Sequence, residues 1–135
     1  MAKISFDFDG TINDHFDGSG NPFKYKVREI LKKLIADGHE IFIVTRRKNE
    51  TSENHIVFEV AEEIGVERNK IFFTNREWKF SQLSKLGIDF HIDDDIYDIM
   101  YINMNTKKIQ SVHLRNEDSI EEFYKLCNTS DEENN

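Results

Sequence analysis

The sequence predicts a single α/β domain, built on a mostly parallel sheet with helices on both faces. Short apolar runs of strand length alternate along the 135 residues with stretches whose apolar positions recur at helical spacing. This alternation is typical of parallel sheets, because each crossover between parallel strands needs a connection of helix length. Acidic clusters follow two of the runs, at the strand ends where open α/β sheets bind their ligands. We expect residues 1–128 to form this domain.

Five apolar runs are predicted to be strands. The first is the clearest, because Ile4, Phe6 and Phe8 occupy every second position directly before an acidic turn. The others are equally short and are bounded by polar or turn residues. In chain order the expected strands are residues 2–8, 40–44, 70–73, 88–92 and 108–114.

Helices are predicted after each strand from apolar residues three and four positions apart. Gly38, Gly65 and Gly87 follow the first three, and Thr51 or Ser52 is the expected cap of the second. The fourth segment could also be a strand, but a helix that begins at the acidic cluster is favoured. The expected helices are residues 27–35, 57–64, 78–86, 96–104 and 120–127.

Composition excludes several classes of protein. The net charge is −8, from 18 basic and 26 acidic residues, which disfavours stable binding to nucleic acid. The single cysteine, Cys127, excludes an internal disulfide and fits a reducing compartment. No apolar stretch approaches membrane-spanning length and no secretory leader is evident, so we expect a cytoplasmic protein. Part of the acidic excess lies in residues 129–135, which are expected to be a disordered tail.

Two acidic clusters predict a metal site. Asp7 and Asp9 follow the first strand, and Asp93-Asp94-Asp95 with Asp98 follows the fourth. If these strands are neighbours, the carboxylates crowd together, and like charges about 4 Å apart cost about 4 kcal/mol per pair at an effective dielectric constant near 20. A hard cation relieves this repulsion, and oxygen ligands favour Mg²⁺. The five histidines are scattered and are expected to be structural or exposed rather than ligands.

A magnesium-bound phosphate beside an aspartate predicts phosphoryl transfer through an aspartyl-phosphate. Such a site needs a proton donor, a hydroxyl that binds phosphate and a cation opposite the metal. Asp9, two residues after the nucleophile Asp7, can be the donor, and Thr45 ends a strand where its hydroxyl can reach phosphate. Lys79, at the start of the third helix, is the preferred cation, with Lys70 and Lys85 as the alternatives.

The order of these motifs resembles the haloacid dehalogenase-like (HAD) hydrolase superfamily, in its small, capless, phosphatase-type members. The resemblance covers residues 2–98 and includes DFDGT, the strand that ends in Thr45, a lysine and HIDDD with Asp98. It implies a three-layer α/β/α Rossmann-like fold without a large cap domain, and activity as a phosphoric monoester hydrolase. It also implies that Asp7 is the nucleophile and that Asp9 acts as general acid and then as base.

The resemblance also implies the ligand sets. The implied magnesium ligands are Asp7, the carbonyl of Asp9, Asp94 and either Asp98 or Asp93. The residues expected to bind substrate are Gly10, Thr11, Thr45, Arg46 and Lys79. Residues 12–24 leave room for only a small flap hairpin, so the site is expected to be open. An open site suits macromolecular substrates, or small ones enclosed by a second copy in a homo-oligomer.

Two other functions fit parts of the pattern. A two-component receiver domain also combines aspartates, threonine, lysine and magnesium, but there the phosphorylated aspartate ends a middle strand. A catalytically weak relative that binds metal or phosphorylated partners would keep the same residues. Among substrates, phosphates of nucleotides or polynucleotide ends are ranked first because Arg46, Arg47 and Arg76 lie near the expected rim. Sugar phosphates and phosphoproteins remain open.

Overall fold

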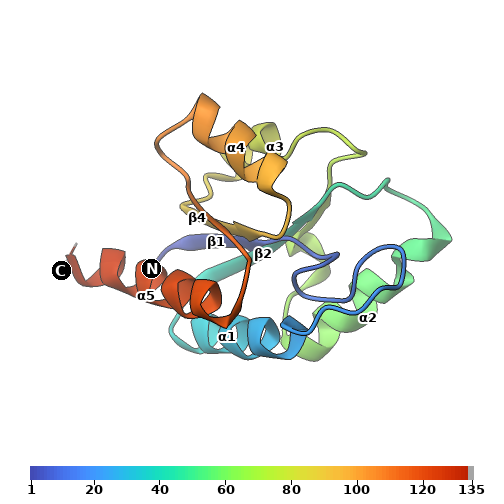
Figure 1. The fold of residues 1–135 in the computed structure, drawn as a ribbon, viewed down its shortest axis with the longest axis horizontal. Coiled ribbons are helices and arrows are strands. Elements are labelled where there is room, and N and C mark those ends of the chain that lie inside the picture. Colours follow the sequence, from blue (N-terminus) through green and yellow to red (C-terminus); the bar gives the residue numbers. More distant parts are fainter. Residues whose placement is uncertain (134–135) are drawn as a thin grey trace.

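The computed structural model, which describes residues 1–133, is a three-layer α/β/α structure of the Rossmann-like kind (Figure 1). Its five-stranded sheet is parallel throughout and has the order β3-β2-β1-β4-β5. The predicted α/β class is therefore confirmed. The strands are β1 (Lys3–Phe6), β2 (Glu40–Thr45), β3 (Ile71–Phe73), β4 (Phe90–Asp93) and β5 (Gln110–His113).

Helices cover both faces of the sheet, as predicted. Figure 1 shows α1, α2 and α5 on one face and α3 and α4 on the other. Two short 3₁₀ helices, Ser52–Asn54 and Arg68–Lys70, precede α2 and β3. The α-helices are α1 (Lys24–Ala36), α2 (His55–Ile64), α3 (Phe80–Leu86), α4 (Ile96–Asn105) and α5 (Glu117–Glu133).

Two apolar cores hold the helices against the sheet. Consecutive residues of β2 point to opposite faces, so Ile43 enters the core under α1, α2 and α5 while Phe42 enters the core under α3 and α4. Phe6 of β1 meets Phe123 of α5 edge to face, with ring centroids 5.5 Å apart. Cys127 lies in the same core and is fully buried. Strands buried on both faces explain the continuous apolar runs of the sequence.

Several local predictions need correction. Strand β1 ends at Phe6, before the predicted end at residue 8, because the chain begins to turn at Phe8. Thr51 is the N-cap of the 3₁₀ helix rather than of α2 and makes no capping hydrogen bond through its side chain, and Ser52 is the first residue of that 3₁₀ helix. The segment 96–104 is a helix, as favoured, and the Asp95 carboxylate caps it by accepting a 2.9 Å bond from the Tyr97 N–H.

The two peripheral segments also differ from expectation. Residues 12–23 form turns and irregular loop with one isolated bridge from Asn13 to Asp9, and the structure assigns no flap hairpin to them. Helix α5 continues to Glu133, while 134–135 lie outside the described residues, so the tail over 129–135 stays a prediction. None of the helices described within residues 1–133 has the length and apolar character needed to cross a membrane.

Candidate functional site

The carboxyl ends of β1 and β4 bring three carboxylates together. These strands are direct neighbours, and the Asp7 N–H donates to the Ile92 carbonyl at 3.0 Å, which extends their pairing by one residue. Within the described residues, one oxygen each from Asp7, Asp93 and Asp94 lies within 4.8 Å of the others. Such a set of hard oxygen donors fits a divalent cation such as Mg²⁺. The two acidic clusters therefore meet as predicted.

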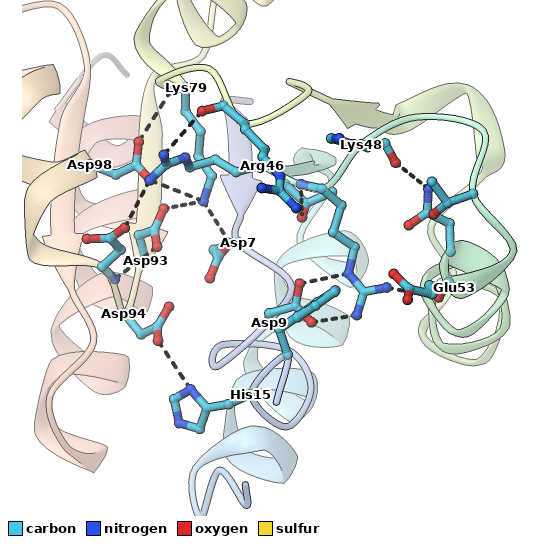
Figure 2. A pocket seen from close by; sticks show the side chains of 17 residues that line it. Asp7, Asp9, His15, Arg46, Lys48, Glu53, Lys79, Asp93, Asp94 and Asp98 are labelled. Carbon is cyan, nitrogen blue, oxygen red and sulfur yellow. Dashed lines mark hydrogen bonds and ion pairs between the residues drawn. The ribbon is translucent and has the colours of Figure 1, made fainter. Parts of the chain in front are cut away.

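Lys79 lies inside this carboxylate cluster (Figure 2). Its ammonium is 2.7 Å from Asp7 Oδ1, 2.5 Å from Asp93 Oδ2 and 3.9 Å from Asp98 Oδ2, and the residue is 1 % exposed. The other two candidate lysines lie elsewhere. Lys70 pairs with Glu40 beside β2, and Lys85 is exposed on α3. Of the three, Lys79 is thus the lysine that the fold places in the site.

Burial and neighbouring charges shift the pKa values of this cluster in different directions. Burial raises the pKa of Asp7, and the Asp93 charge raises it further. Burial acts in the same direction on Asp93, but Lys79 and a hydrogen bond from His91 outweigh it and lower the pKa of Asp93. Burial opposes the charge of Lys79, yet Asp7 and Asp93 together raise its pKa. Asp93 and Lys79 therefore form the stable ion pair, and Asp7 is the carboxylate most in need of further positive charge.

A buried polar chain holds Asp93 in place. Its Oδ2 lies 2.9 Å from His91 Nε2, and His91 Nδ1 lies 2.6 Å from the Ser5 hydroxyl on the neighbouring strand. All three residues are fully buried. The Asp95 N–H donates to Asp93 Oδ1 at 3.0 Å. This support was not predicted, although polar residues inside the apolar runs 2–8 and 88–92 were a visible signal for it.

Asp9 faces a different partner. Its two carboxylate oxygens accept from Arg47 Nε at 2.8 Å and from Arg47 Nη2 at 2.7 Å (Figure 2). This pair is bidentate, so both oxygens of the carboxylate are occupied as acceptors. Asp98 accepts from the Lys79 N–H at 3.3 Å, and its Oδ2 is buried without a hydrogen-bond partner. The three-carboxylate grouping thus includes Asp93 rather than Asp98, and ligation by the Asp9 carbonyl stays a prediction.

The remaining predicted site residues either support the carboxylate cluster or line the cleft beside it. Thr11 donates through Oγ1 to Asp7 Oδ2 at 3.0 Å, so it holds the carboxylate, and it is fully buried. Gly10 has φ +78°, and a Cβ there would lie 2.2 Å from Asp94 Oδ2, so the close approach requires glycine. Thr45 is buried at the end of β2 and lines the cleft. Arg46 also lines it, with its guanidinium 4.5 Å from the Trp78 ring.

These residues surround an open cleft of about 570 Å³. Its floor is the carboxylate cluster with Lys79, and the segment after β2 forms one wall. His15 and Phe16, from the turns after β1, form another. The volume lies within the range of small-ligand sites and exceeds what a lone phosphate needs.

No model of a known protein family matches the chain, and no curated protein matches it. Functional inference therefore rests on the sequence motifs and on the geometry of this cleft.

Proposed function

We propose that the protein is a magnesium-dependent phosphohydrolase that cleaves phosphate monoesters through an aspartyl-phosphate on Asp7. One observation carries the proposal. Asp7 is held between Lys79 at 2.7 Å and the Asp93 and Asp94 carboxylates, at the strand end that opens into the cleft. This arrangement offers a positioned nucleophile, a fixed cation for phosphate charge and a place for a metal. Asp7, Asp93 and Asp94 would hold Mg²⁺, which supplies charge neutralisation to the substrate phosphate.

The residues divide the reaction between them. A carboxylate oxygen of Asp7 attacks phosphorus, the bond to the leaving oxygen breaks, and that oxygen takes a proton from Asp9. Asp9 then accepts a proton from water as the water oxygen attacks phosphorus, which releases phosphate and restores the Asp7 carboxylate. Thr11 and Lys79 hold the Asp7 carboxylate during both steps, since they donate to Oδ2 and Oδ1 respectively.

Asp9 cannot give a proton while Arg47 occupies both of its oxygens. The proposed cycle therefore needs Arg47 to release Asp9, and a substrate phosphate is a suitable competing anion for the guanidinium. The same ion pair favours a second candidate function, in which the protein binds metal or phosphorylated partners with little turnover. Substrates of the first candidate would include nucleotide or polynucleotide-end phosphates.

Phosphate release separates the two candidates. The chain is assayed with p-nitrophenyl phosphate and a panel of nucleotides and sugar phosphates, in Mg²⁺ and in EDTA. We expect magnesium-dependent turnover that falls at least about 1000-fold in Asp7→Asn. Lys79→Ala should lose orders of magnitude in turnover, while Lys85→Ala, in the helix that follows Lys79, should stay near wild type. Undiminished hydrolysis by Asp7→Asn would refute the assignment of Asp7 as the nucleophile. Absence of phosphate release from every substrate of the panel, with retained Mg²⁺ binding, would favour the second candidate.

A further inference from the structure

One wall of the cleft, formed by the segments after β2 and β3, carries two positive charges without carboxylate partners. Lys48 follows β2 and Arg76 follows β3, and both line the cleft and are exposed. Arg46 also lines the cleft, but its Nη1 lies 3.4 Å from Asp95 Oδ2 and 3.9 Å from Asp98 Oδ2. Across residues 1–133, the side chains of Lys48 and Arg76 make no ion pair or hydrogen bond. Figure 2 shows Lys48 across the opening from Asp93 and Asp98. In a chain of net charge −8, unpaired cations gathered on one wall indicate a place for an anion.

The backbone at Arg76 adds an independent observation. Arg76 has φ 70° and follows Asn75 at φ 54°, in a tight turn where Glu77 N–H donates to the Thr74 carbonyl at 3.0 Å. The left-handed region is costly for a side chain with a Cβ, and glycine occupies it without that cost. Because the Arg76 side chain is exposed, packing does not offset the strain. The turn thus holds an exposed arginine at the cleft, with its guanidinium available to bind an anion.

Hydrogen bonds with Arg46 hold this turn near Lys79 and Asp98. Arg76 N–H donates to the Arg46 carbonyl at 2.7 Å, and Arg46 Nη2 donates to the Arg76 carbonyl at 3.1 Å. Arg46 Nη1 and Lys79 Nζ each lie 3.9 Å from the same oxygen, Asp98 Oδ2. Lys79 and Arg46 are thus separated by at most twice that distance. Positive charge continues from the floor of the cleft, through Arg46, to the loop that carries Arg76.

We propose that the cleft binds a small phosphate monoester with a second anionic group, a phosphate or a carboxylate, and that Lys48 and Arg76 form the subsite for this second anion. Arg46, whose Nη1 already faces Asp95 and Asp98, connects the two anion sites through its hydrogen bond to the Arg76 carbonyl. The inference rests on the proposed function, which places the first phosphate beside Asp7 and Lys79. A planar guanidinium can bind either kind of second anion through two parallel hydrogen bonds. Esters with a single anion would leave this wall unpaired and bind more weakly.

Non-hydrolysable ligands test the subsite without turnover. Titration calorimetry on the full chain in Mg²⁺ compares propylphosphonate with propane-1,3-bisphosphonate and 4-phosphonobutyrate, which add a second phosphonate or a carboxylate. We expect either double anion to bind at least tenfold more tightly than propylphosphonate. The bisphosphonate arm and the carboxylate arm then show which second anion the wall prefers.

Two variants locate the effect, and a third is the control. Arg76→Gly should lose at least fivefold in affinity for the preferred double anion with little change for propylphosphonate, and its Tm should equal or exceed that of wild type because the strain is relieved. Lys48→Ala should lose affinity in the same way. Lys85→Ala, an exposed lysine outside the cleft, should keep the wild-type preference. Arg76→Asn, which tolerates positive φ, repeats the test if the glycine variant folds poorly.

The outcomes distinguish this inference from the proposed function. Equal binding of single and double anions, a preference retained in both variants, or no binding of any phosphonate would overturn the second subsite. Equal kcat/KM for matched mono- and bisphosphate esters would overturn it as well, while leaving the phosphohydrolase intact. Conversely, tight binding of double anions with no phosphate release from any ester would support the subsite and refute the proposed function.

Discussion

Replacing Lys79 with methionine should destabilise the metal-free protein strongly. The substitution keeps a long side chain in a site that is 1 % exposed but removes the ammonium between Asp7, Asp93 and Asp98. The carboxylates then repel one another without compensation. Burial of these groups gives the repulsion more weight than it would have at the surface.

The size of the effect follows from the contacts. Each unit-charge pair about 4 Å apart interacts by about 4 kcal/mol at an effective dielectric constant near 20, and two partners of Lys79 are closer than that. Desolvation cancels much of this energy, and removing one partner of a buried ion pair typically costs about 3–5 kcal/mol. For a domain of this size about 1 kcal/mol corresponds to roughly 3–4 °C in Tm, so we expect Tm to fall by roughly 10–18 °C.

Thermal unfolding followed by circular dichroism in EDTA measures this loss, with Lys85→Met on the exposed side of α3 as the control. The pKa of Asp93 is lowered in the fold, so the wild-type ion pair contributes fully above the ordinary aspartate pKa, and this contribution is lost as the pH falls from there through the lowered pKa. The raised pKa of Lys79 keeps the pair charged into the alkaline range. In the variant, acid protonates Asp7 and relieves the repulsion, so the deficit should be smaller at pH 5 than at pH 8.

Added Mg²⁺ should restore part of the lost stability, because the ion supplies positive charge to the same carboxylates. A Tm for Lys79→Met within about 3 °C of wild type in EDTA would refute the electrostatic reasoning, since that difference corresponds to only about 1 kcal/mol.

Affinity for Mg²⁺ should fall with pH, because burial raises the pKa of Asp7 and Asp94 and a metal ion must displace the protons they hold. Calorimetric titration should give a Kd at least about tenfold weaker at pH 5.5 than at pH 8, and pH-independent binding would place the ion elsewhere. Gly10→Ala places a Cβ 2.2 Å from Asp94 Oδ2 and should cost about 1–3 kcal/mol and weaken Mg²⁺ binding. Gly18→Ala, with similar φ but open space around it, should leave the metal affinity unchanged. Asp95→Ala removes the cap of α4 and should lower Tm by roughly 3–4 °C, about 1 kcal/mol, while Asp95→Asn should retain most of it.

Local patterns predicted most of the fold. The helix over 27–35 could be recognised because its apolar residues form one stripe, and Leu31 and Leu34 of that stripe are fully buried. Apart from the first strand, whose apolar residues alternate, burial on both faces gave the strands continuous apolar runs, which do not mark the strand ends. The true ends depend on where neighbouring strands stop pairing, and that information lies in other parts of the chain.

The identity of the buried lysine was a harder question. Lys70, Lys79 and Lys85 all lie between Thr45 and β4, and each is an ordinary polar residue in its local sequence. Lys79 becomes inaccessible only in the folded chain, where it contacts Asp7, Asp93 and Asp98, while Lys85 stays exposed. The position of Lys79 at the predicted start of the third helix correctly favoured it, but that position alone could not exclude Lys70 and Lys85.

Arg47 shows what the sequence could not predict. Its partner Asp9 lies 38 residues away, and the two meet because β1 and β2 are adjacent strands whose ends open into one cleft. An arginine after a strand is equally compatible with solvent exposure or with binding a substrate phosphate. Long-range ion pairs of this kind depend on strand order, which the local pattern does not contain.

The buried thiol of Cys127, a residue of α5, offers a kinetic probe of motion outside the cleft. Cys127 is the single cysteine of the sequence, and helix α5 must leave the sheet before a thiol reagent can reach it. When reclosing is fast, the labelling rate equals the intrinsic thiol rate multiplied by the fraction of molecules that are open. Comparing this rate with and without Mg²⁺ would show whether an ion at the carboxyl end of β1 also slows the opening of α5. The labelling rate of Cys127 thus reports whether the opening of α5 is coupled to ion binding in the cleft.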